Sequence, residues 1–181
     1  MVSVFVFLIL AWQFYIGYSR GIILQGYYFV ANIISLVFAV QFYRSLADLL
    51  TLWVPYSNPL EGSSVYFFKS VDLFDLSQVF YAGIAFFSIY VVAYLIFRFL
   101  GIFVHFTKVD RFDKLYFRLI SGGLSLLVTI CFLGLFFNGL ATIPVDLIQD
   151  FLNGSWLIRL LIHFPVVSQL VQAFWVSAIL K

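Results

Sequence analysis

Charged residues are scarce in this sequence. Asp, Glu, Lys and Arg together make up 10% of the 181 residues, and Arg20 is the sole charged side chain before Arg44. Hydrophobic residues make up 64%, with 24 Phe, 11 Tyr and 4 Trp. A water-soluble domain of this length cannot bury so much apolar surface. The composition therefore predicts an integral membrane protein.

The residues that usually carry catalysis or metal binding are few as well. The sequence has one cysteine and two histidines, His105 and His163, and it contains no glycine-rich phosphate loop, nucleophile elbow or HExxH motif. The topology predicted below places the two histidines on opposite sides of the membrane, which disfavours a shared metal site. The net charge of +2, without a basic run, does not favour nucleic acid as a partner. We therefore expect a non-enzymatic protein without a metal or cofactor.

Long charge-free runs predict the spans. About 20 mostly apolar residues are needed to cross the hydrocarbon core as a helix. Four charge-free runs qualify, 1–19, 21–43, 76–97 and 119–145. They predict spans over about 2–19, 22–43, 77–99 and 119–141, the third of which ends at the charge of Arg98. Amphipathic spacing predicts interfacial helices over about 45–54, 64–76, 100–117 and 156–180. The last of these has two interpretations, a helix in the interface or against the bundle, or a fifth span. The expected fold is all-α, a single polytopic membrane domain over 1–181.

Lys and Arg are distributed unequally between the two sides of the predicted membrane. The connections after the first and third spans hold six of them, whereas the segment 44–77 holds Arg44 and Lys69 together with four acids. Because Lys and Arg are enriched in cytoplasmic loops, this bias places the first and third connections in the cytoplasm. Both termini are then expected on the extracytoplasmic side.

Polar side chains inside the spans recur on helical faces. They are Gln25, Asn32 and Ser35 in the second span, and Ser121, Ser125, Thr129 and Asn138 in the fourth. Hydrocarbon offers such groups no partner, so they should face protein or a water-filled space. Two interpretations remain open: hydrogen bonds between packed helices, or a polar path lined by spans two and four. Small residues at four-residue spacing, such as Gly17 and Gly21, favour close helix packing and a homo-oligomer.

Three motifs follow one another along the chain. The first span ends in Gly17-x-x-Arg20-Gly21. An acidic–basic pair precedes the fourth span, either Asp113-Lys114 or Asp110-Arg111. The C-terminal region holds Ser155-x-Leu157, followed by Pro165-x-x-Ser168. In this order and spacing they resemble the colicin V production protein (CvpA) family of bacterial inner-membrane proteins, most like its Gram-positive members, over about residues 4–170. The glycine ladder typical of the family's last span is replaced here by Phe117, Ser121 and Ser125.

The resemblance implies a multi-pass protein of the bacterial plasma (inner) membrane, linked to colicin or bacteriocin production and to envelope homeostasis. Membrane lipids, further copies of the chain and other envelope or export proteins are the expected partners. The alternative is a small channel or transporter subunit. Arg20 is expected to anchor the first hairpin in the cytoplasm, and the family pattern adds a possible contact between Arg20 and Asp110 or Asp113.

Overall fold

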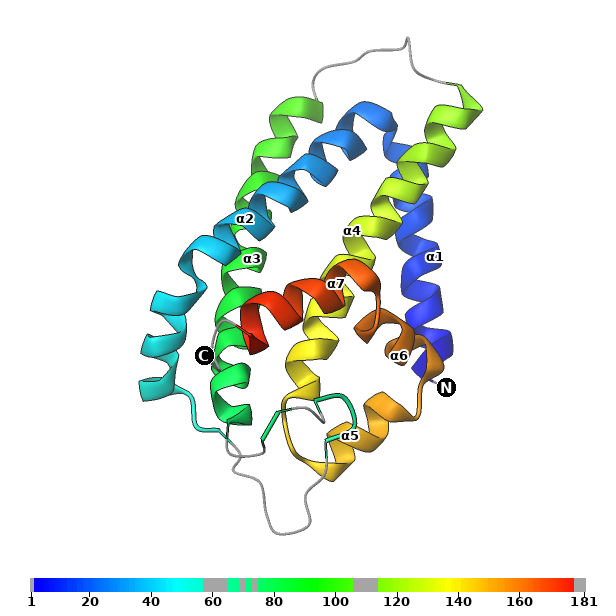
Figure 1. The fold of residues 1–181 in the computed structure, drawn as a ribbon. Coiled ribbons are helices and arrows are strands. Elements are labelled where there is room, and N and C mark those ends of the chain that lie inside the picture. Colours follow the sequence, from blue (N-terminus) through cyan, green and yellow to red (C-terminus); the bar gives the residue numbers. More distant parts are fainter. Residues whose placement is uncertain (1, 57–64, 69–70, 73–74, 106–113, 178–181) are drawn as a thin grey trace.

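The computed structural model describes residues 2–56, 65–68, 71–72, 75–105 and 114–177, and within these ranges the chain forms helices and no strand. The elements are α1 (Val2–Arg20), α2 (Ile22–Trp53), α3 (Leu76–His105), α4 (Leu115–Ala141), α5 (Asp146–Asn153), α6 (Trp156–Ile162), α7 (Pro165–Leu170) and a π-helical turn η2 (Val171–Val176) (Figure 1). In the described ranges, α1 to α4 are long and apolar enough to cross a membrane, and a fifth span exists if α6 and α7–η2 count as one. The predicted all-α polytopic fold is confirmed.

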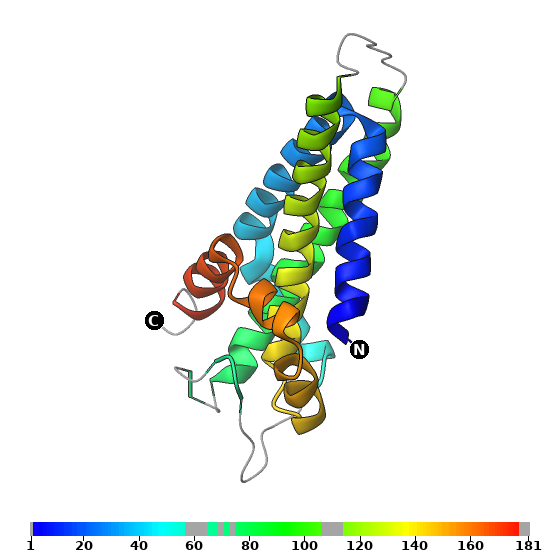
Figure 2. The same ribbon diagram turned by 90° about the vertical axis from the view of Figure 1, so that its right-hand side faces the viewer.

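The four long helices form two pairs. Helix α2 packs against α3 over most of its length, and α1 packs against α4. The turn between α1 and α2 lies at the same end of the bundle as the C-terminus of α3 and the N-terminus of α4, whereas α5 lies at the other end (Figures 1 and 2). The first and third connections therefore share an end, as the predicted topology requires.

A single residue separates α1 from α2. Gly21 has a φ of 83°, in the left-handed region that favours glycine because a side chain would clash with the backbone. A hydrogen bond of 3.2 Å from the amide of Gln25 to the carbonyl of Gly21 then begins α2. The chain reverses direction here, and Arg20 is left at the end of the bundle.

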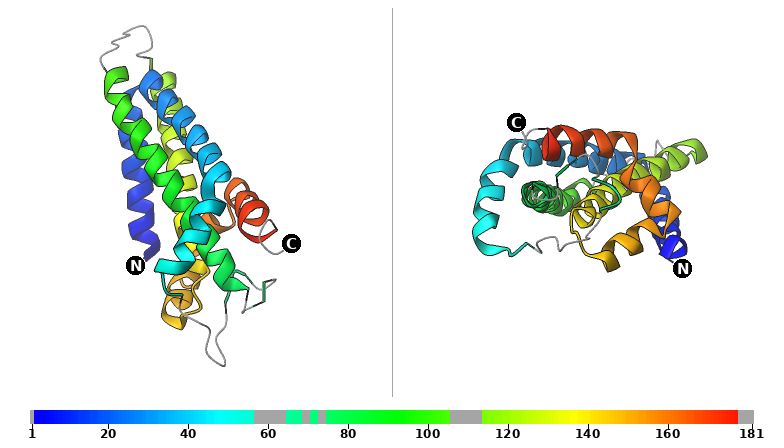
Figure 3. Two further views of the ribbon diagram at one scale, coloured as in Figure 1. Left: turned by 90° about the vertical axis from the view of Figure 1, so that its left-hand side faces the viewer. Right: turned by 60° about the horizontal axis from the view of Figure 1, so that its bottom comes forward.

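The C-terminal elements pack against the bundle. Helix α6 and the α7–η2 segment meet at a 50° bend, and Figure 3 shows α7 and η2 on one side of the bundle with α1 on the other. The ring of Trp175 fills the space beside Gly83 of α3, and Val167 fills the space beside Gly134 of α4. The helix predicted over 156–180 is thus broken at Pro165, which lacks the amide needed to continue α6.

The predicted interfacial helix over 45–54 does not exist as a separate element, because α2 continues without a break to Trp53. Tyr43 and Ala47 stay buried on the same face of α2, and no Gly or Pro interrupts this stretch. The helix predicted over 100–117 is divided between α3 and α4, with the residues between them outside the described ranges.

The predicted helix over 64–76 is also absent from the described residues of that stretch. The amide of Tyr66 donates to the side chain of Gln149 (3.0 Å) instead of to a helical carbonyl. Phe68 and Val71 are both buried, so the segment is held by side-chain packing.

Candidate functional site: a cavity between the helix pairs

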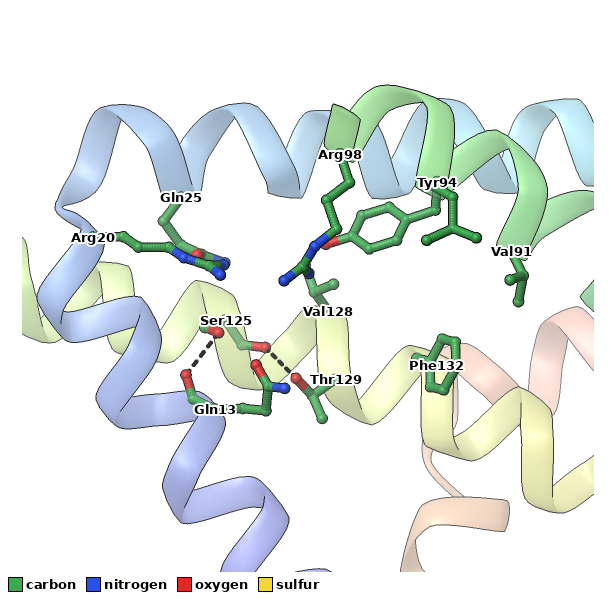
Figure 4. Close-up of a pocket in the computed structure, with 11 residues that line it drawn as sticks. Gln13, Arg20, Gln25, Val91, Tyr94, Arg98, Ser125, Val128, Thr129 and Phe132 are labelled. Carbon is green, nitrogen blue, oxygen red and sulfur yellow. Dashed lines mark hydrogen bonds between the residues drawn. The ribbon is translucent and has the colours of Figure 1, made fainter. Parts of the chain in front are cut away.

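A cavity of about 250 Å³ lies between the two helix pairs, near the end that carries the α1–α2 turn. All four long helices contribute to it (Figure 4). Its lining consists of Gln13, Arg20, Gln25, Val91, Tyr94, Leu95, Arg98, Ser125, Val128, Thr129 and Phe132.

Arg20 and Arg98 bring positive charge to the cavity. Both guanidinium groups lie over the ring of Tyr28, at 5.2 and 5.8 Å from its centroid. Such cation–π contacts hold a cation in place while leaving its N–H groups available. The ring of Tyr94 lies beside Arg98 in the cavity lining (Figure 4). Gly101, one turn after Arg98, makes the tyrosine placement possible, because a Cβ there would lie 2.7 Å from the Tyr28 ring.

Gln25 supplies a buried acceptor. Its residue exposure is 2%, and its side-chain oxygen Oε1 has no hydrogen-bond partner among the described residues. A buried carbonyl oxygen without a donor is unfavourable, and such groups in proteins are usually met by a protein group, water or ligand. Figure 4 shows Gln25, Arg20 and Arg98 pointing into the same space.

The α1–α4 seam forms one wall of the cavity. Ser121 donates to the carbonyl of Gly17, and Ser125 donates to the carbonyl of Gln13 at 2.8 Å. A Cβ on Gly17 would lie 2.8 Å from the backbone oxygen of Ser121, so the two helices touch through their backbones. Thr129 donates within α4 to the carbonyl of Ser125 (2.9 Å). These hydroxyls mainly join or support the helices.

Toward the middle of the bundle the cavity is bounded by a buried polar and aromatic layer. The Tyr90 hydroxyl donates a 2.6 Å hydrogen bond to Asn32 Oδ1, and both side chains are buried. The rings of Phe87 and Tyr90 pack on Phe132, with centroids 5.3 and 6.3 Å apart. The described cavity therefore ends at this layer.

The seven polar span residues divide into two groups. Gln25, Ser125 and Thr129 line the cavity. The other four make hydrogen bonds within the protein: Ser121 and Asn32 as above, Ser35 to the carbonyl of Ala31, and Asn138 to the carbonyls of Gly134 and Ile162.

The C-terminal motif builds α6 and α7 and is separate from the cavity. Ser155 accepts from the amide of Ile158 as the cap of α6, and its hydroxyl contacts that of Ser3 at 2.8 Å. Pro165 begins α7, and Ser168 donates back to the carbonyl of Pro165 (3.1 Å).

The acidic–basic pair predicted before the fourth span is described only at Lys114, which is exposed and precedes the first turn of α4. Asp110, Arg111 and Asp113, and with them the predicted contact to Arg20, lie outside the described residues.

Sequence reasoning did not select Arg98, Tyr94 and Gln13 as site residues. Arg98 was recognisable as a charge at a span end, and Tyr94 stands one helical turn before it. The contribution of Gln13 to the seam is a backbone carbonyl, which gives no sequence signal. Across the described ranges, no group of three His, Cys, Asp or Glu side chains is placed to hold a metal ion.

Fold and cavity together define a small polytopic helical membrane protein with a cationic cavity near one end of its bundle. The sequence matches the family model described as colicin V production protein over residues 2–165, so the chain belongs to that family, as the motifs predicted. It is also similar to YshB of Bacillus subtilis, described as an uncharacterized transmembrane protein, with 27% identity over 177 residues and 97% of each chain covered. No solved structure matches.

Proposed function

We propose that this chain is a non-enzymatic protein of the bacterial plasma membrane that supports the production or export of a colicin V-type toxin and the homeostasis of the cell envelope. It acts by holding a small ligand in the cavity at Arg20 and Arg98. The description of its family supports the link to toxin production. The cavity is the main support for the proposal, because it offers the positive charge of two arginines and the unpartnered Oε1 of Gln25.

A binding role fits the lining better than a catalytic one. The hydroxyls of Ser125 and Thr129 are engaged with backbone carbonyls. A nucleophilic hydroxyl would instead need a general base within hydrogen-bond reach. Guanidinium groups serve well to recognise anions.

A deletion strain tests this function. Loss of the gene in its own bacterium should lower bacteriocin output and raise sensitivity to membrane stress, and the wild-type chain should restore both. Arg98→Gln should restore them poorly, whereas Arg44→Gln, which alters an exposed arginine outside the cavity, should restore them fully. A deletion that changes neither output nor stress sensitivity would contradict the proposal.

Self-association is part of the proposal. One face of α1 is apolar and exposed, including Phe5, Leu8, Trp12 and Tyr15, and it is available to a second copy or to lipid. In a Cys131→Ala background, Trp12→Cys should give disulfide-linked dimers in native membranes. Val37→Cys on the exposed face of α2 is the matched control. Equal cross-linking at both positions would indicate random collision and contradict an α1 interface.

The second candidate is a channel or transporter subunit. The cavity is lined by Phe132, whose ring packs against Tyr90 of the Tyr90–Asn32 hydrogen bond. Opening that layer would extend the polar space toward the other end of the bundle. Purified protein in liposomes should then pass ions or small solutes, and Asn32→Leu should alter the flux. Absence of flux under tension, voltage and solute gradients would exclude this role.

A further inference from the structure

The positive charge of the cavity is not balanced by its described lining. Arg20 comes from α1 and Arg98 from α3, and among the described residues that line the cavity none is acidic. Two like charges in a partly buried site repel each other more strongly than they would in water. An anion bound to both guanidinium groups offsets this repulsion.

Gln25 requires a hydrogen-bond donor from the ligand, whereas the two arginines require acceptors. Its buried Oε1, unpartnered within the described chain, can only accept a hydrogen bond. A simple anion would leave this oxygen unmet, because it offers acceptors alone. The ligand that satisfies all three side chains therefore presents acceptors to Arg20 and Arg98 and a donor to Gln25.

The size and position of the cavity limit the ligand further. A volume of about 250 Å³ lies just below the usual range for pockets that hold small molecules, so it suits a compact polar group. Arg98 and Leu95 are exposed, so the cavity can be reached from outside the bundle. Arg20 is the last residue of α1, and charged side chains at span ends lie at the level of the lipid headgroups.

We propose that the cavity binds a phosphate group that carries its own hydrogen-bond donor, with Arg20 and Arg98 on the phosphate oxygens and Gln25 accepting from the donor. Guanidinium groups match phosphate oxygens in pairs. A carboxylate group, unlike a phosphate group, keeps no proton near neutral pH and so has no O–H donor. A protonated phosphate has an O–H group, and a phosphoethanolamine headgroup has N–H groups. The inference rests on the proposed function only in taking the cavity as a binding site.

Free phosphate and a lipid headgroup are separated by two matched pairs of probes. Purified full-length protein in detergent is titrated with inorganic phosphate and with sulfate at about pH 6, where phosphate keeps a proton and sulfate has none. Protein in nanodiscs of phosphatidylethanolamine or phosphatidylcholine is compared by native mass spectrometry for retained lipid, since the choline headgroup lacks N–H groups. We expect about a tenfold preference for the donor-bearing member of one pair, and that pair identifies the source. No binding, or equal binding within both pairs, would overturn the inference.

Variants of the lining residues test whether the preference for the donor-bearing ligand arises in the cavity. Arg20→Gln and Arg98→Gln should each weaken binding by about tenfold or more, and Arg20→Lys should weaken it less. Gln25→Leu should abolish the preference within the responding pair while leaving residual binding. Arg44→Gln is the matched control, because Arg44 lies 5.8 Å from the Tyr43 ring centroid in a comparable contact away from the cavity. Thermal melting of every variant checks that it is folded, and an effect of Arg44→Gln equal to that of Arg98→Gln would overturn the inference.

The carboxylates of Asp110 and Asp113 in the third connection are the alternative partners of Arg20 and Arg98. Phosphate or ethanolamine lipid that binds only after Asp110→Asn and Asp113→Asn would assign the arginines to these carboxylates and overturn the inference. The binding assays are independent of the deletion phenotype. Phosphate binding with an unchanged deletion phenotype would therefore reject the proposed function and keep the phosphate site. A deletion phenotype without phosphate binding would keep the proposed function and reject the phosphate site.

Discussion

The Tyr90 hydroxyl and the Asn32 side-chain oxygen lie 2.6 Å apart and join α3 to α2 where both residues are buried. Because hydrocarbon offers no alternative partner, these two side chains satisfy each other between α2 and α3. The same layer bounds the cavity, so the interaction that stabilises the bundle also separates the cavity from the opposite end.

Removing this hydrogen bond should destabilise the bundle modestly. We expect Tyr90→Phe to lower the free energy of unfolding by about 1 kcal/mol, the usual size of such bonds in membranes. Asn32→Leu should lower it as well, and the double variant should cost less than the sum of the single ones. Unfolding in mixed detergent micelles measures all three, and strictly additive losses would show that the two residues do not interact.

Gly17 should tolerate no side chain. In Gly17→Ala the new methyl group would meet the side chain of Ser125 and the backbone oxygen of Ser121, which cannot move without shifting α4. We expect a loss of about 1–3 kcal/mol, as in other overpacked sites. Gly123→Ala, on the same helix pair, has no atom within 4 Å of the new methyl group and should cause no loss. Equal melting temperatures for the two variants would contradict the backbone contact.

Trp175 should hold the C-terminal elements on α3. Its side chain is fully buried beside Gly83 and Phe86, so Trp175→Ala should cost about 3 kcal/mol or more and expose α7 to protease. Its indole N–H has no partner among the described residues. Trp175→Phe removes that unmet donor while keeping a ring, and should cost clearly less. Gln172→Ala, at an exposed position of η2, is the control.

Local sequence patterns predict the spans, and they predict that the polar residues within the spans face protein or a water-filled space. They do not predict which helices pair. The four apolar runs and the turn at Gly21 follow from composition and from backbone chemistry. The prediction of a separate helix after residue 44 is wrong, because the charge of Arg44 does not end α2. The exposed Arg44 side chain is accommodated at the surface, where its Nε donates to the Tyr43 hydroxyl (3.1 Å). The meeting of Arg20, Arg98 and Gln25 depends on how three helices pack and face one another, which the spacing along any one helix does not determine.

Stability should fall at high pH because of Tyr56. Its hydroxyl donates to the carbonyl of Thr142 (2.9 Å), and burial followed by the nearby Tyr81 raises the pKa of Tyr56 to about 12. An unfolded tyrosine loses its proton near pH 10. The contribution of this group to stability is therefore complete below pH 10 and is lost as the pH rises toward 12. Melting temperatures of the wild type and Tyr56→Phe across this window should converge at the alkaline end, and parallel curves would contradict the shift.

The predicted orientation can be tested with two matched hydroxyl residues. Ser19 near the C-terminal end of α1 and Thr51 near the C-terminal end of α2 are exposed and lie at opposite ends of the bundle (Figure 1). Each donates to the carbonyl three residues earlier (2.9 and 2.7 Å). Neither side chain supports another helix, so Ser19→Cys and Thr51→Cys in a Cys131→Ala background should leave the fold intact. With the Arg20 turn in the cytoplasm, a membrane-impermeant maleimide should label Thr51→Cys in intact cells and Ser19→Cys only after permeabilisation. The reverse pattern would place the cavity at the outer face, where its phosphate ligand would come from the outer leaflet or the medium.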